Sequence, residues 1–311
     1  MALDHVNVYV IDEGDSWTII DTGFWSKKTQ SIWSDIKEKW FSDKPIGKVI
    51  VTHHHPDHVG LAGWFQTEFK AELWMSRTAW LMARMLRLDY QKLPTQETIN
   101  FWRRAGMDDL ILNERATGKP FNFGDSVHEM PLGFRRIIDG EKIILGNRSW
   151  IVRVGNGHAP EHLTLWCEDE PIVIAGDQII SSISPNLGVY ATEPDADPVQ
   201  EWLTSCEAFL PFSNDKQLVL PGHKLPFYGL PHRLKQLIEN HHSALKRLVA
   251  FLKEPQTAVD CFPVLFNRKI SDNEYGLALV EAVAHLNHLY RKKIVKRELN
   301  SKGAYVYTLK N

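Results

Sequence analysis

The chain has 311 residues, of which 43% are hydrophobic and 24% charged, with a formal net charge of −2. This balance is typical of a globular protein with a hydrophobic core, and it excludes fibrous and disordered chains. No apolar run reaches membrane-spanning length, and no basic-then-apolar signal segment begins the chain. Three scattered cysteines predict no disulfide framework, so we expect a cytoplasmic protein without a membrane partner. A strand-like stretch already starts at Val6, which suggests that the natural chain extends further upstream.

Short apolar stretches alternate with amphipathic segments over most of the chain. This alternation predicts a layered α/β fold with helices on the outside. The strands are expected at 6–11, 17–21, 48–52, 71–75, 141–145, 149–154, 162–167, 171–176 and 217–223, and helices at 27–39 and 198–210. The segment 77–121 has helical periodicity instead, and we interpret it as a helical insertion.

Ligand-type side chains follow four of these strands, at the point where each strand ends. The stretch THHHPDHVG comes after an apolar run at 49–51, and His158, Asp177 and His223 each follow another strand and a glycine. Strand ends gather at one edge of an α/β sheet, where such folds hold their ligands. Histidine and aspartate clusters in this position are typical of metal sites.

The spacing inside the first cluster predicts a first ion. In extended chain, His53 and His55 point to the same side and can bind one metal together. We expect His158 to complete that site. His54 lies between the two ligands and is expected to face away, so it is given no role.

A second ion is expected beside the first. The chain turns at Pro56, so Asp57 and His58 aim at a different point nearby. His223 supplies another nitrogen, and Asp177 supplies a bridging carboxylate. Nitrogen and carboxylate ligands without thiolate fit two zinc ions best, with iron or manganese as alternatives.

The HxHxDH pattern at 53–58, followed by His158, Asp177 and His223, resembles the metallo-β-lactamase superfamily. The bridging aspartate is similar to that of glyoxalase II rather than of true β-lactamases, which have a cysteine ligand. The early IIDTG, with Asp21, also resembles a motif of that superfamily in which the aspartate supports the metal-binding loop. The resemblance implies an αββα sandwich, with the metals at one edge of two facing sheets and a catalytic domain over residues 1–230.

This site predicts hydrolysis. Two neighbouring cations lower the pKa of a bridging water toward neutrality, and the resulting hydroxide attacks a carbonyl or a phosphorus. We expect Asp57 to be both a ligand and the catalytic residue that orients the hydroxide. Asp21 is expected to fix a histidine tautomer, although a turn-forming aspartate explains its position comparably well.

Four further polar residues are weaker candidates. His162 follows His158 by four positions and either supports the ligands, contacts substrate, or is an ordinary hydrogen-bonded histidine. Lys224, Ser181 and Asn186 follow metal-ligand candidates closely enough to contact substrate. Lys224 is as readily a surface lysine, and polar residues of a loop need no such role.

The last part of the chain has a different character. Residues 231–311 contain 14 Lys/Arg and 7 Asp/Glu, whereas the rest of the chain is acidic. Their pattern predicts helices followed by two short strands around NSKG. This resembles the winged-helix domain attached to some superfamily members, including β-lactamase-like protein 2, an endoribonuclease. The domain could bind nucleic acid through its basic residues, or simply pack on the catalytic domain or mediate a homodimer.

Three functions fit the sequence. We favour a dinuclear metal-dependent hydrolase of a small ester, thioester or lactone. The alternatives are a metal-dependent nuclease that uses the basic tail, and an iron-dependent sulfur dioxygenase or other oxidoreductase on the same scaffold. The acidic catalytic region disfavours a long polyanionic substrate. A small-molecule substrate is therefore the expected partner.

Overall fold

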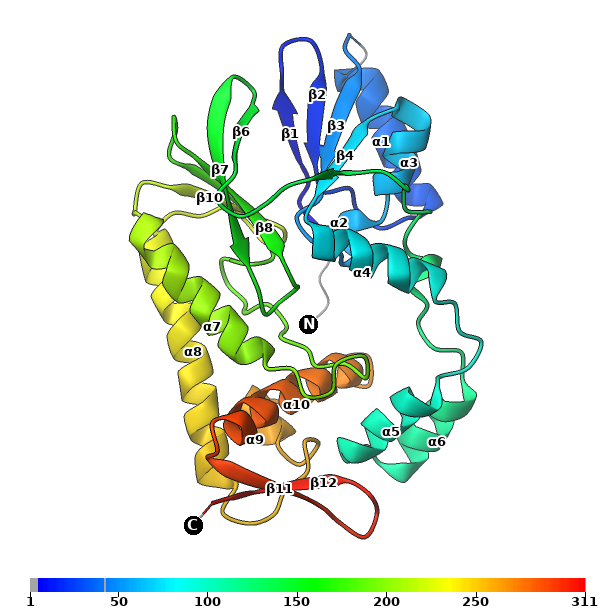
Figure 1. Ribbon diagram of the computed structural model, residues 1–311, viewed down its shortest axis with the longest axis vertical. Helices are drawn as coiled ribbons and strands as arrows, with labels where there is room; N and C mark the ends of the chain where they lie inside the picture. Colours follow the sequence, from blue (N-terminus) through cyan, green and yellow to red (C-terminus); the bar gives the residue numbers. More distant parts are fainter. Residues whose placement is uncertain (1–4, 42, 311) are drawn as a thin grey trace.

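Two five-stranded sheets face each other in the upper half of the view of the computed structural model, which describes residues 5–41 and 43–310 (Figure 1). In the first sheet the strand order is β1-β2-β3-β4-β5, and all neighbours are parallel except β1 and β2. Its strands are β1 (Tyr9–Asp12), β2 (Trp17–Ile20), β3 (Ile46–Ile50), β4 (Glu72–Met75) and β5 (Arg135–Arg136).

The second sheet has the order β10-β9-β8-β7-β6, and only β10 and β9 run parallel. Its strands are β6 (Lys142–Leu145), β7 (Arg148–Gly155), β8 (His162–Cys167), β9 (Ile172–Gly176) and β10 (Leu218–Pro221). Alternation places one face of each strand in the interior: in β6, Ile143 and Leu145 are buried while Lys142 and Ile144 are exposed. All the strands expected from the sequence are present.

The two sheets share a hydrophobic core made by their facing sides. Ile20 and Ile50 of the first sheet pack there with Trp150, Leu165 and other residues of the second. Helices cover the outer faces. Helices α1 (Lys27–Trp40) and α3 (Ala62–Phe69) lie on the first sheet, and α7 (Pro198–Phe209) and α8 (Leu230–Phe251) lie on the second (Figure 1). This confirms the αββα sandwich.

The predicted helical insertion contains α4 (Arg77–Leu88), α5 (Gln96–Arg104) and α6 (Asp109–Thr117), and these helices pack against different partners. Ala79 and Ala83 of α4 are buried in the core of the first sheet. By contrast, Phe101 of α5 and Leu112 of α6 belong to the same core as the C-terminal helices. Sequence periodicity predicts a buried face for each helix, but it does not identify the partner that covers it.

The C-terminal part contains α9 (Phe262–Phe266), α10 (Tyr275–Arg291) and an antiparallel hairpin of β11 (Val295–Leu299) and β12 (Tyr305–Leu309). Helices followed by a hairpin were expected here; the winged-helix assignment and the boundary at 230/231 stay predictions. The remaining short elements are α2 (Pro56–Val59) and the 3₁₀ turns η1 (Phe123–Asp125) and η2 (Leu210–Phe212). Within the described residues, no helix combines the length and the apolar character needed to cross a membrane.

Candidate metal centre

The carboxyl ends of four strands meet at one edge of the sandwich, as the sequence predicts. The histidine cluster follows β3 and enters α2, and His158 lies between β7 and β8. Asp177 directly follows β9, and His223 comes two residues after β10. Backbone bonds tie these ends together, because the amide of Gly222 donates to the carbonyl of Gly176 at 2.7 Å.

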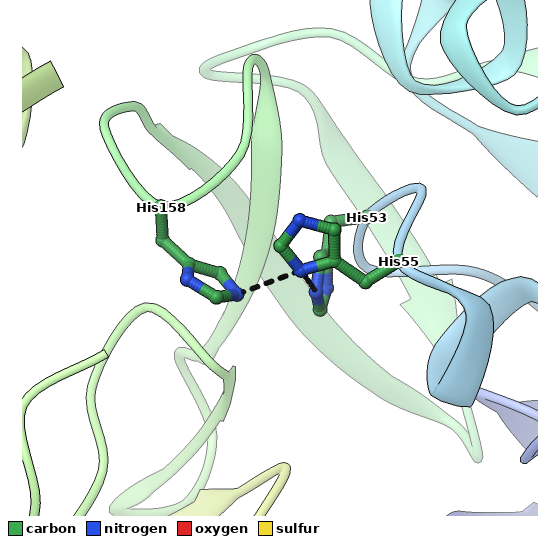
Figure 2. Close-up of side chains that lie close together, drawn as sticks. All are labelled: His53, His55 and His158. Carbon is green, nitrogen blue, oxygen red and sulfur yellow. Dashed lines mark hydrogen bonds between the residues drawn. The ribbon is translucent and has the colours of Figure 1, made fainter. Parts of the chain in front are cut away.

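Three imidazoles converge on one point (Figure 2). Nδ1 of His55 lies 3.0 Å from Nε2 of His53 and 3.0 Å from Nε2 of His158. Nitrogens this close, with their rings set at steep angles to one another, form a group that could hold a metal ion. His53 and His55 therefore face the same side, and His158 joins them from the facing sheet.

A second group of ligand-type atoms adjoins the first. Nε2 of His223 lies 3.1 Å from Oδ2 of Asp57 and 3.3 Å from Oδ2 of Asp177. Nε2 of His58 lies 3.4 Å from Oδ1 of Asp177. Oδ2 of Asp177 is also 3.6 Å from Nε2 of His158, so this carboxylate lies between the two groups. Asp57, His58 and His223 form a further set that could hold an ion.

Several of these atoms have no partner of their own. Nε2 of His58, Oδ1 of Asp177 and Nε2 of His223 are buried and make no hydrogen bond. An isolated buried polar atom costs about 1–3 kcal/mol, so unpartnered atoms that face one another need an explanation. A divalent cation supplies it, since all three atoms are metal-ligand types. The residues present thus fit a metal.

The pKa values divide the site into two parts. Burial, followed by the neighbouring histidines, holds the pKa of His53 and His55 well below the usual value, so both rings are neutral and able to bind a metal. Burial alone would lower the pKa of His58 and His223 too. Without a metal, the carboxylates of Asp177 and Asp57 outweigh it, and raise the pKa of His58 well above the usual value and that of His223 to about 10. Each ring would have to lose this proton when a cation binds.

Asp21 sits behind the site and organises it. Its Oδ1 accepts the backbone N–H of Thr52 at 2.8 Å, and its Oδ2 accepts both the Thr52 hydroxyl and Nδ1–H of His58 at 2.8 Å. Nδ1 of His53 lies 3.0 Å from the same hydroxyl. One buried carboxylate thus fixes His58 directly and His53 through Thr52, leaving Nε2 of both rings for a ligand. These are the hydrogen bonds that the tautomer role of Asp21 requires, and that role stays a prediction.

Asp21 has a positive φ of 60°, a left-handed conformation that aspartate tolerates better than most residues. Its amide donates to the carbonyl of Ile50 at 2.9 Å, so the strand end holds this conformation in place.

Backbone carbonyls orient two further ligand candidates, His158 and His223. Nδ1 of His158 bonds the carbonyl of Asn186 at 2.9 Å, and Nδ1 of His223 bonds the carbonyl of His5 at 2.6 Å.

His162 lies beside the centre, outside the groups that could hold an ion. Its ring stacks on His53 with centroids 4.5 Å apart, and its Nε2 accepts the backbone N–H of Asp177 at 3.1 Å. His162 is fully buried and contacts both His53 and the backbone of Asp177. A supporting role for His162 stays a prediction.

The three residues predicted to contact substrate are placed differently. Ser181 and Lys224 are half-buried near the strand ends, and Lys224 has a positive φ of 67°. Asn186 turns its amide toward α10, where it donates to Oε2 of Glu281 at 2.7 Å. Contact of these residues with substrate remains a prediction.

Sequence reasoning missed Thr52, which belongs to the site, and the contact that Glu281 makes with Asn186 outside it. Thr52 immediately precedes the histidine cluster, so its hydroxyl could have been suspected from its position. Glu281 is 95 residues from Asn186, and no local pattern connects them. Gly222 was recognised as preceding a ligand, and the structure gives the reason: a Cβ at this position would lie 2.2 Å from Oδ1 of Asp177.

Comparisons with known proteins agree with this geometry. The model of the metallo-beta-lactamase superfamily matches residues 1–223, and the model of the metallo-beta-lactamase-like C-terminal domain matches residues 245–310. The chain is 23% identical over 323 aligned positions to the probable metallo-hydrolase YqjP of Bacillus subtilis (strain 168), covering 99% of this chain and 95% of that protein.

Among solved structures, a beta-lactamase domain protein from Burkholderia ambifaria is 30% identical, with a TM-score of 0.90 over 100% of this chain and 90% of the other. A metallo-beta-lactamase family protein from Thermus thermophilus shares the fold at 24% identity, with a TM-score of 0.79 over 98% of this chain and 94% of the other. The chain belongs to the metallo-β-lactamase superfamily.

Proposed function

We propose that this member of the metallo-β-lactamase superfamily is a dinuclear metal-dependent hydrolase of a small ester, thioester or lactone. The position of Asp177 carries the proposal. Its Oδ1 faces His58, and its Oδ2 faces His158 and His223, at 3.3–3.6 Å from the nearest ring nitrogens. A carboxylate placed between two ligand groups could be shared by two neighbouring cations, which together would supply the chemistry of a two-metal hydrolase.

The ligands divide accordingly. We assign Nε2 of His53, Nδ1 of His55 and Nε2 of His158 to the first ion. Asp57, His58 and His223 belong to the second, and Asp177 is shared. The all-nitrogen-and-oxygen set favours zinc, with iron and manganese as the alternatives.

When bound, two such cations supply Lewis acidity toward a carbonyl oxygen and lower the pKa of a water. The chain supplies the orientation. Asp57 is the most accessible member of the second ligand group, with its side chain 19% exposed, so its carboxylate can reach both an incoming water and substrate. Burial raises its pKa, but His58 and His223 outweigh that effect, and the carboxylate is ionised and able to accept a hydrogen bond from the water.

The basic tail gives no specific support to the nuclease alternative. Arg297 forms an ion pair with Asp195 at 3.1 Å, and Arg291 donates to the Asp195 carbonyl at 2.7 Å. Lys296 pairs with Glu298 at 3.3 Å. Arg291 and Arg297 thus fasten the tail to the segment that carries Asp195, and Lys296 pairs within its own strand. A small-molecule substrate remains our expectation, and a homodimer remains a prediction.

Metal content tests the proposal, and it separates the oxidoreductase alternative as well. We expect two zinc ions per chain by elemental analysis, falling toward one in His58→Ala. His54→Ala is the matched control, since His54 belongs to neither ligand group, and it should keep both ions. The purified enzyme should cleave model esters or thioesters and lose this activity on chelation. A single iron that His58→Ala leaves in place would refute the dinuclear assignment and favour oxidative chemistry.

A further inference from the structure

The segment between β9 and α7 connects the metal centre with the C-terminal part of the chain. Within it, the Asn186 carbonyl accepts Nδ1–H of His158 at 2.9 Å. This bond fixes the tautomer of His158 and aims its Nε2 at His55, 3.0 Å away. The position of one peptide carbonyl therefore decides how well His158 is presented to an ion.

Helix α10 holds that peptide in place. The Asn186 side-chain amide donates to Oε2 of Glu281 at 2.7 Å and to the Leu277 carbonyl at 3.3 Å. Three residues further on, the backbone amide of Val189 donates to the Val280 carbonyl at 3.1 Å. Leu187 and Val189 are fully buried in the core that also contains residues of α10. The segment is thus clamped to the C-terminal helix at and beyond Asn186.

Among these contacts of α10, the one from Glu281 can be removed cleanly by a point substitution. The bonds to Leu277 and Val280 use backbone carbonyls, whereas Glu281 contributes a side chain. Glu281 also lines a cavity of about 300 Å³, together with Ser184, His241 and His285 among others. Truncating Glu281 would enlarge this cavity at some cost in the free energy of unfolding, so the stability of the variant is measured separately.

We propose that Glu281 is a positioning residue for the metal centre, acting through Asn186 on His158. The inference rests on the proposed function, since it assumes that His158 binds an ion. It assigns to the C-terminal domain a contribution to metal affinity that is separate from any contact with substrate. The contribution is indirect. Glu281 of α10 positions Asn186, the carbonyl of Asn186 orients the imidazole of His158, and Nε2 of that imidazole faces the site of the first ion.

Three variants test it. Glu281→Ala removes the acceptor of the Asn186 amide, whereas Glu281→Gln retains an acceptor oxygen without the charge. Asn287→Ala is the matched control. Asn287 also reaches from α10 to the same connecting segment, donating to the carbonyls of Pro194 and Ala196 at 2.9 and 3.0 Å, but it does not lead to a ligand.

The readout is zinc affinity, measured on the full chain by competition with a chromogenic chelator. Residues that orient metal ligands typically change affinity by about 10–100-fold. Because Glu281 acts through one more residue, we expect a loss of about 10-fold in the affinity of the His158 site for zinc in Glu281→Ala, at the lower end of that range. Glu281→Gln should restore most of the affinity, and Asn287→Ala should bind zinc like the wild type.

Equal zinc affinity in Glu281→Ala and the wild type would overturn the inference. So would an equal loss in Glu281→Ala and Asn287→Ala, because that result would mean that any loosening of α10 has the same effect. Thermal unfolding of each variant without metal measures that loosening independently. Failure of the proposed function itself is recognised differently, since the wild type would then not hold two zinc ions or would cleave no model ester or thioester.

Discussion

Replacing Asp21 by asparagine should disable one ligand while keeping the shape of the site. Oδ2 of Asp21 accepts Nδ1–H of His58, which leaves Nε2 of that ring as a lone-pair donor. An asparagine tolerates the same positive φ, and its oxygen can still accept the amide of Thr52. Its NH₂ group then faces Nδ1 of His58. That contact favours the opposite tautomer, with the proton on Nε2, where it blocks metal binding.

The magnitude follows from the choices open to the asparagine side chain. If the amide flips, its NH₂ faces the backbone N–H of Thr52 instead, and a buried donor loses its acceptor. Either orientation leaves one unsatisfied contact in a site where the side chain of His58 is fully buried. Such a contact costs about 1–3 kcal/mol, which corresponds to about 5–150-fold in affinity at 1.4 kcal/mol for each factor of ten.

The assay is a zinc titration of the wild type and Asp21→Asn, with circular dichroism to show that both are folded. We expect the second equivalent of zinc to bind about 5–150-fold more weakly in the variant, by the same estimate, and the first to change less. Asp21→Ala should have a lower free energy of unfolding than Asp21→Asn, since it also leaves the amide and the hydroxyl of Thr52 without this acceptor. Wild-type affinity for both equivalents in Asp21→Asn would refute the tautomer argument.

Two further predictions concern other parts of the chain. Gly222→Ala places a methyl group 2.2 Å from Oδ1 of Asp177, which should displace this carboxylate. Elemental analysis should therefore show a loss of metal, while the unfolding temperature falls only modestly. Full metal content in the variant would contradict the argument that a side chain at this position crowds Asp177. His241 is buried, and burial, then His285, lowers its pKa to about 3 from 6.5 in the unfolded chain. Below pH 6.5 the unfolded chain takes up a proton on His241 that the folded protein does not, so the free energy of unfolding falls as the pH falls toward the folded pKa. The loss at pH 5 is about 2 kcal/mol, and above pH 6.5 there is none. Urea unfolding at about pH 7.5 and pH 5 should show a smaller difference in His241→Asn than in the wild type, and equal differences would contradict this origin.

The sequence predicted which ligand candidates lie together because its signals are local. Each candidate closely follows an apolar strand, and the ends of neighbouring and facing strands lie at one edge of the sandwich. Asp21 was identified with two possible roles; its hydrogen bonds to Thr52 and His58 are those that the tautomer role requires, and that role stays a prediction.

What the sequence could not predict are the pairings between distant segments. The contact of Asn186 with Glu281 joins a loop to a helix 95 positions away, and neither residue has a local pattern that requires the other. The same holds for α5, whose apolar face was visible as helical spacing although its partner was not. Periodicity predicts which face of a helix is buried, whereas the element that packs against this face is known only from the tertiary structure.

The sharing of one core by α5, α6 and the C-terminal helices has a consequence for synthesis of the protein. The two insertion helices end at Thr117, whereas α9, which packs in the same core, begins at Phe262. At about 5–20 residues per second, the ribosome needs roughly 7–30 s to make the intervening chain. During that interval Phe101 and Leu112 have no completed core to enter. The N-terminal sandwich can fold first, but the apolar faces of α5 and α6 stay exposed to solvent until the C-terminal helices have been synthesised.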